Sequence, residues 1–99
     1  MKIRILREAE IDLIEGFNFY ELQQPGLGDY FLDALYADID SLLISAGIHV
    51  VESDHHKMLA KRFPFAVYYT LTNDHVNIHA VLDCRKDPAW TRDRLRHFR

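Results

Sequence analysis

The hydrophobic period of the chain changes after its first six residues. Ile3 and Ile5 alternate with basic residues, which predicts a strand over residues 2–6. From Glu8 onward apolar residues recur at helical spacing. The helix expected there ends at Pro25-Gly26, because a proline pushes the residue before it out of helical geometry. Its apolar face is predicted to comprise Ala9, Ile11, Leu13, Ile14, Phe17 and Tyr20.

A second helical stripe follows and predicts a helix from about residue 27 to 46. Gly47 is a suitable residue to end it. The short Pro-Gly connection indicates that the two helices form an antiparallel pair. The stripe consists of Leu27, Phe31, Leu35, Ile39, Leu42 and Ala46.

The second half of the chain predicts strands over residues 58–63, 65–72 and 76–82, preceded by a loop over residues 52–56. Asn73-Asp74 is expected to form the turn of a hairpin, which fixes the register. The face expected to pack on the helices pairs Leu71 with Val76, Tyr69 with Ile78, Val67 with Ala80 and Phe65 with Leu82. The other, semi-polar face pairs Thr70 with Asn77, Tyr68 with His79 and Ala66 with Val81, and function is expected there.

A final helix is predicted from Ala89 to about Phe98, with Asp87 as its N-cap and Pro88 at its first position. The expected order is an N-terminal strand, an antiparallel helical hairpin, a three-stranded antiparallel meander and a short C-terminal helix. A helical hairpin on one face of such a sheet is an α+β architecture, and residues 1–99 are expected to form one domain.

The charge is divided unevenly between the two halves of the chain. Residues 1–54 hold three basic and eleven acidic residues, a net charge of −8, and residues 55–99 hold nine basic and four acidic, a net charge of +5. Such asymmetry indicates an interaction surface. The sequence has no apolar run of membrane-spanning length, no signal-peptide pattern and one cysteine, Cys84, so a soluble cytoplasmic protein is expected.

The chain resembles the RelE/ParE superfamily, the toxins of bacterial type II toxin–antitoxin modules, often called plasmid stabilisation proteins. The resemblance extends in order over nearly the whole length of the chain. It is carried by Ala9, Asp12-Leu13, Tyr20, Pro25-Gly26-Leu27-Gly28, Phe31, Phe63-Pro64-Phe65, Tyr68-Tyr69, Ala80-Val81-Leu82, Arg85-Lys86-Asp87-Pro88, Trp90 and Arg94.

The resemblance implies one of two activities on the same fold. RelE-like members cleave messenger RNA in the ribosome with basic residues on the sheet and a Tyr or His near the last strand. ParE-like members lack that set, and those characterised inhibit DNA gyrase. Both kinds are neutralised by an antitoxin that wraps the toxin. The fold by itself does not decide between the two.

RNA cleavage requires a general base, cations for the charge on phosphorus and an acid for the leaving oxygen. The candidates in this sequence are Lys61, Arg62, Tyr68, His79 and Arg85. Two departures favour the ParE-like activity. The last strand ends with Asp83-Cys84 in place of a catalytic His or Tyr, and the C-terminus has no tyrosine, although His97 is a candidate base.

The basic residues of the C-terminal part are predicted to bind a partner, either an acidic antitoxin segment or an acidic target surface. Trp90 is expected to dock the last helix as a core residue, with a cation–π contact to Arg94 as a further candidate. The predicted partner-binding residues are Arg62, Arg85, Lys86, Trp90, Arg92, Arg96 and Arg99.

No metal and no cofactor are expected. Asp54-His55-His56 has no second ligand pair at a recognisable spacing and is predicted to be a mobile polar loop. The sequence is therefore compatible with three functions. The first is a ParE-like toxin that binds a protein target, with gyrase as the named candidate. The second is a ribosome-dependent mRNA endoribonuclease, and the third is an inactive homologue that only binds an antitoxin.

Overall fold

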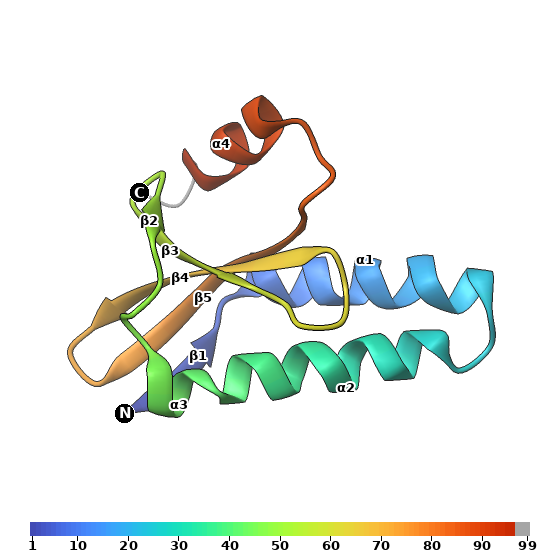
Figure 1. Cartoon of the computed structure of the whole chain (residues 1–99), viewed down its shortest axis with the longest axis horizontal. Helices are drawn as coiled ribbons and strands as arrows, with labels where there is room; N and C mark the ends of the chain where they lie inside the picture. The colour runs from blue at the N-terminus through green and yellow to red at the C-terminus, as the bar shows by residue number, and fades with distance from the viewer. Residues whose placement is uncertain (97–99) are drawn as a thin grey trace.

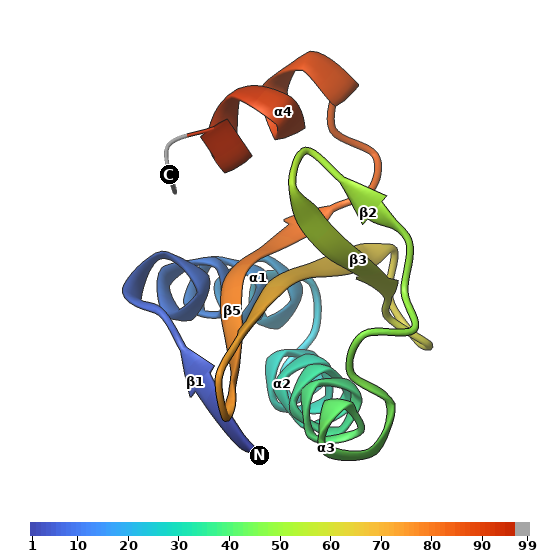
Figure 2. The same cartoon turned by 90° about the vertical axis from the view of Figure 1, so that its left-hand side faces the viewer.

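The computed structural model describes residues 1–96 and has an α+β fold, as predicted. Its elements are β1 (Lys2–Ile5), α1 (Arg7–Gln23), α2 (Leu27–Asp40), α3 (Leu42–Ser45), β2 (Val51–Glu52), β3 (His55–Leu59), β4 (Phe65–Thr72), β5 (His75–Asp83) and α4 (Pro88–Arg96). The long helices α1 and α2 cover one face of the sheet and α4 lies over the other (Figures 1 and 2).

The sheet has five strands in the order β1-β5-β4-β3-β2. The first strand pairs with β5 in parallel after the helical crossover, and all other neighbours are antiparallel. The meander β3–β4–β5 was predicted, but its first strand lies earlier than expected. His55 and His56 belong to β3, because the turn before them, at Ser53 and Asp54, has positive φ at both positions and closes a tight hairpin with β2.

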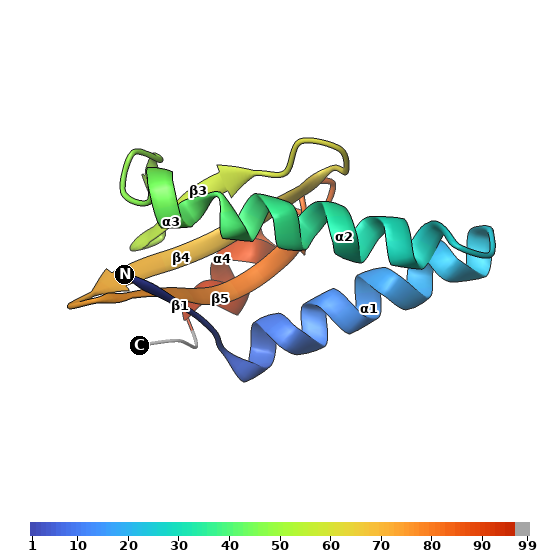
Figure 3. The same cartoon turned by 90° about the horizontal axis from the view of Figure 1, so that it is seen from below.

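Two glycines allow the helices of the hairpin to approach closely. A Cβ on Gly16 would lie 2.5 Å from the Phe31 ring, and one on Gly28 would lie 2.8 Å from the carbonyl oxygen of Phe17. The carboxylate of Glu21 accepts hydrogen bonds from the backbone N–H groups of Gly26 and Gly28, and so caps α2 across the turn. Figure 3 shows the two helices antiparallel beneath the sheet.

The predicted helix over residues 27–46 is divided. It consists of α2 and the single turn α3, with Ser41 between them, whose hydroxyl donates to the carbonyl oxygen of Asp38. The apolar face predicted for α1 is also partly wrong. Ile11 and Ile14 are 40% and 59% exposed, whereas Asp12 is buried.

A β-bulge between β4 and β5 changes the predicted register. Leu71 lies opposite Val76 and Tyr69 opposite Ile78, as expected, but a shift follows between Tyr68 and Tyr69. His79 is the extra residue on β5. Beyond it the pairs are Tyr68 with Ala80, Val67 with Val81, Ala66 with Leu82 and Phe65 with Asp83. Because one extra residue reverses the faces, Ala80 and Leu82 turn away from α1 and α2 and pack with Leu95 of α4.

The predicted start of α4 is confirmed, since the Asp87 carboxylate accepts the N–H of Ala89 at 2.9 Å. Leu95 is the buried residue of this helix, and the core on the other face of the sheet is formed by α1, α2 and the inner strands. No helix among the described residues is long and apolar enough to cross a membrane.

Candidate functional site

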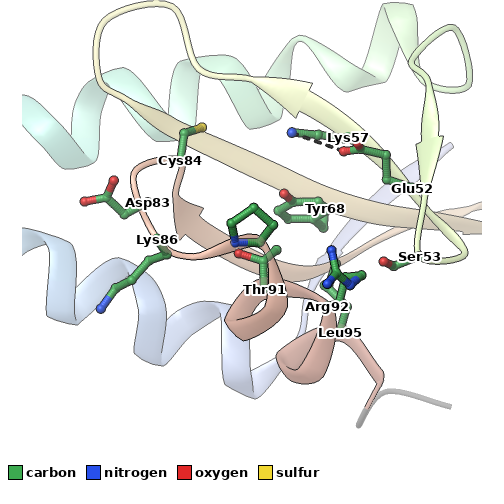
Figure 4. Close-up of a pocket in the computed structure, with 11 residues that line it drawn as sticks. Glu52, Ser53, Lys57, Tyr68, Asp83, Cys84, Lys86, Thr91, Arg92 and Leu95 are labelled. Atoms are coloured by element: carbon green, nitrogen blue, oxygen red, sulfur yellow. Dashed lines mark ion pairs between the residues drawn. The ribbon is translucent and has the colours of Figure 1, made fainter.

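A cleft of about 400 Å³ separates the α4 face of the sheet from α4 itself (Figure 4). Its floor is Tyr68, its outer wall is the β2–β3 hairpin and its roof is α4. The lining residues are Glu52, Ser53, Lys57, Tyr68, Asp83, Cys84, Lys86, Pro88, Thr91, Arg92 and Leu95. This is the semi-polar face on which the sequence predicted function.

The wall of the cleft carries an ion pair next to a buried phenol. The Lys57 ammonium lies 3.1 Å from a carboxylate oxygen of Glu52, and this contact raises the pKa of Lys57. Burial raises the pKa of Tyr68, although the charge of Lys57 acts against that rise. Burial also raises the pKa of the Cys84 thiol. The cleft therefore presents a protonated phenol and a thiol, which are hydrogen-bond donors and not general bases at neutral pH.

The predicted cross-strand pair of Tyr68 and His79 is wrong. Tyr68 lies opposite Ala80, and the His79 ring is joined by a hydrogen bond of 2.8 Å to the Thr70 hydroxyl. Its centroid is 4.8 Å from that of the His55 ring. Burial, with a smaller contribution from His55, lowers the pKa of His79 to about 4. At neutral pH His79 is therefore an uncharged residue of the sheet.

The three basic nuclease candidates lie at the end of the sheet where the β3–β4 loop meets the end of β5. Cys84 N–H donates to the carbonyl oxygen of Pro64, and so holds the two segments together. Lys61 and Arg62 are exposed there, and Arg62 Nη1 lies 3.4 Å from the Tyr30 hydroxyl.

Arg85 forms a bidentate ion pair with Asp83. Its Nε lies 2.9 Å from Oδ1 and its Nη2 lies 2.7 Å from Oδ2. The pair lowers the pKa of Asp83 and raises that of Arg85. The Arg85 guanidinium is therefore already bound to a carboxylate within its own chain.

The residues of α4 are arranged differently from the prediction. Trp90 is 43% exposed and is not a core residue. The cation over its ring is the Lys86 ammonium, 4.9 Å from the centroid, whereas the Arg94 guanidinium binds Asp12 of α1 at 2.8 Å through both Nη atoms. Arg92 and Arg96 are exposed, and Arg96 lies 3.9 Å from Asp93. His97 and Arg99 lie outside the described residues.

Sequence reasoning missed two residues that organise this region. Lys57 was assigned to neither the predicted loop over residues 52–56 nor the predicted strand over residues 58–63, although its position opposite Tyr68 on β3 places it in the cleft. Asp12 was named only among the residues of the family resemblance, without a structural role, yet it accepts the N–H of Val81, where β5 extends beyond its pairing with β1. A carboxylate on the buried face of α1, between Ala9 and Leu13, was the signal that it has a partner.

The two adjacent histidines point to opposite faces of β3. His55 lies beside His79, and His56 stacks on the Tyr69 ring at 4.9 Å. Within residues 1–96 no three His, Cys, Asp or Glu side chains are grouped so that they could hold a metal ion.

Comparison with known proteins supports the architecture. No protein-family model and no curated protein matches the sequence. Among solved structures, the fold is similar to that of a chain of the chromosomal ParDE TA system from P. aeruginosa, with a TM-score of 0.74 at 15% sequence identity. The match covers 82% of this chain and 92% of that chain. The protein therefore has the ParE-like toxin fold that the sequence resemblance predicted.

Proposed function

We propose that the protein is the toxin of a type II toxin–antitoxin module, that it stops growth by binding a protein target, and that a cognate antitoxin neutralises it. DNA gyrase is the first target to test. The structural likeness to a chain of a ParDE system supports the assignment to a toxin–antitoxin module. The separation of the nuclease candidates from one another supports a ParE-like mode of action.

The observation that carries this proposal is the bidentate pairing of Arg85 with Asp83. A ribonuclease of this fold requires cations that are available to the scissile phosphate. Arg85 is paired with Asp83, and His79 is hydrogen-bonded to Thr70. Tyr68 lines the cleft under α4, whereas Arg62 lies beside Tyr30 of α2. The sequence candidates are therefore not gathered around one point.

The surface for the partners is formed by exposed side chains of α4 and the sheet end. Arg92 and Arg96 are exposed on α4, Lys86 lies over the Trp90 ring, and Arg62 is exposed on the β3–β4 loop beside Tyr30 of α2. Trp90 lies on the side of α4 that faces α1, whereas Arg92 faces the cleft. An acidic antitoxin segment matches the positive charge of the basic residues.

Expression of the chain in a bacterial host tests the mode of action. We expect growth arrest with intact transcripts, and we expect purified protein to inhibit the supercoiling activity of gyrase. Arg92→Glu should relieve arrest, whereas Arg4→Glu, an exposed charge reversal on β1, should not. Unaffected supercoiling at toxin excess would remove gyrase as the target.

The cleft provides a specific observation for a second candidate, a ribosome-dependent endoribonuclease. Lys57, Tyr68 and Arg92 line one cavity and could hold a phosphate beside a phenolic acid. This function predicts transcripts cut soon after induction, and loss of cutting in a folded Lys57→Ala variant. Antitoxin binding without any growth arrest would instead support the third candidate, an inactive homologue.

A further inference from the structure

The solvent face of α1 carries a row of apolar side chains that the described part of the chain leaves exposed. Ile11, Ile14 and Leu22 are 40%, 59% and 90% exposed. Their spacing places them on one side of the helix, opposite the buried residues Ala9 and Leu13, with the exposed Asn18 between Ile14 and Leu22. From Ile11 to Leu22 the row is about 16 Å long.

Acidic residues flank this row on both sides. Glu8 and Glu15 lie along one side and Glu10 along the other, and all three are exposed. The basic residue of α1, Arg7, lies at its first position and at the N-terminal end of the same face, four residues before Ile11. The carboxylate of Glu21 accepts hydrogen bonds from the N–H groups of Gly26 and Gly28 and is therefore already engaged within the chain.

The contacts of α1 with the rest of the described chain are made by its opposite side and its edge. It packs on α2 and β5 through Ala9, Leu13, Gly16 and Tyr20, and α4 reaches it through the bond from Arg94 to Asp12. Isolated exposed apolar residues are ordinary, but a row at helical spacing with charged flanks is the pattern of a helix that meets another helix.

We propose that this face of α1 is a docking surface for a basic amphipathic helix of a partner protein. The occupant packs its apolar stripe on Ile11, Ile14 and Leu22, and its Lys or Arg residues lie beside Glu8, Glu10 and Glu15. The surface is opposite in charge to the positive region of α4. It therefore goes beyond the proposed function, because it selects a partner of the opposite charge to an acidic antitoxin segment.

Binding of designed peptides to the purified full chain tests the proposal. The probe is a synthetic helix with leucines at every third or fourth position and lysines elsewhere, and its counterpart carries glutamates in place of the lysines. We expect one molecule of the basic peptide to bind, with NMR shift changes centred on the α1 face. We expect no binding of the acidic peptide.

Matched variants separate the contribution of the apolar side chains to peptide binding from that of the carboxylates. Replacing Ile14 and Leu22 by Gln should weaken binding at least about tenfold, because buried apolar anchors carry most of an interface's affinity. Replacing Ile44 and Ile48 by Gln, two residues that are 95% and 77% exposed on a different surface, should change it little. Glu8→Gln with Glu15→Gln should weaken binding and reduce its salt dependence.

Several results would overturn the proposal. They are shift changes that map away from α1, equal affinity for the acidic peptide, or equal losses in the α1 pair and the Ile44/Ile48 pair. Self-association of the free chain that Leu22→Gln abolishes would assign the face to a second copy instead. None of these readouts depends on growth arrest, so the proposal and the proposed function can fail separately.

Discussion

Arg94 is predicted to be the residue whose loss most weakens the attachment of α4. Its two Nη atoms lie 2.8 Å from the two carboxylate oxygens of Asp12, whose side chain is 5% exposed and which also accepts the N–H of Val81. Arg94→Met keeps much of the side-chain volume but leaves a buried carboxylate without its cation.

The expected loss follows from this geometry. Breaking a fully buried ion pair by removing one partner costs about 3–5 kcal/mol, because the remaining charge stays buried. Arg94 is 21% exposed and the Val81 N–H still binds Asp12, so we expect a lower loss. The free energy of unfolding should fall by about 2–4 kcal/mol at pH 7.

The pH dependence gives a second readout. Burial raises the pKa of Asp12 above its usual value, and Arg94 opposes that rise. Without Arg94 this pKa rises further, so the variant takes up a proton on Asp12 as the pH falls and the penalty of the buried charge disappears. The difference from wild type should therefore be largest at pH 7 and should shrink toward pH 4.

Urea unfolding followed by circular dichroism at pH 7 and pH 4 measures both effects. The double variant Asp12→Asn with Arg94→Met should recover part of the stability, because an asparagine carbonyl can still accept the Val81 N–H. A loss below about 0.5 kcal/mol at pH 7, as for an exposed pair, would refute the reasoning. So would a loss that does not change with pH.

Three further predictions use the same unfolding assay. Gly16→Ala should cost about 1–3 kcal/mol because the new methyl group would overlap the Phe31 ring, whereas Asn18→Ala on the exposed side should cost little; equal values would contradict the close helix approach. Tyr69→Phe should cost about 1–2 kcal/mol because its buried hydroxyl accepts the Gly47 N–H at 2.9 Å and lies 2.6 Å from His49 Nδ1, and the exposed Tyr36→Phe is its control. The pKa of His79 is lowered to about 4 in the folded chain, so as the pH falls the unfolded chain is protonated at this histidine before the folded chain is. The free energy of unfolding should therefore decrease as the pH is lowered from about 6.5 to about 4. His79→Gln should flatten that slope and His75→Gln should not.

The sequence predicted the order and type of the main elements because their signals are local. The spacing of apolar residues is a signal that extends over only a few residues. The same is true of the Pro25-Gly26 break before α2 and of the Asp87-Pro88 start of α4. The same holds for the Asn73-Asp74 turn, which placed Leu71 opposite Val76 correctly.

The bulge at His79 was not predictable in this way, because an alternating pattern continues through it without a break. Its consequence is a tertiary contact, because the extra residue turns Ala80 and Leu82 toward Leu95 of α4, which is distant along the chain from the Asn73-Asp74 turn. The cleft was missed for the same reason, since Lys57 and Arg92 come to line one cavity only after β3 and α4 are placed. Asp12 and Arg94 are 82 residues apart, and their pairing is likewise visible only in the fold.

The most direct test of the proposed function is the viable count after induction of this chain, with and without the reading frame adjacent to its gene. We expect a fall in viable count when the chain is expressed alone and recovery when the adjacent protein is co-expressed and binds it. Continued growth with the folded chain alone, or arrest that no adjacent protein relieves, would contradict it.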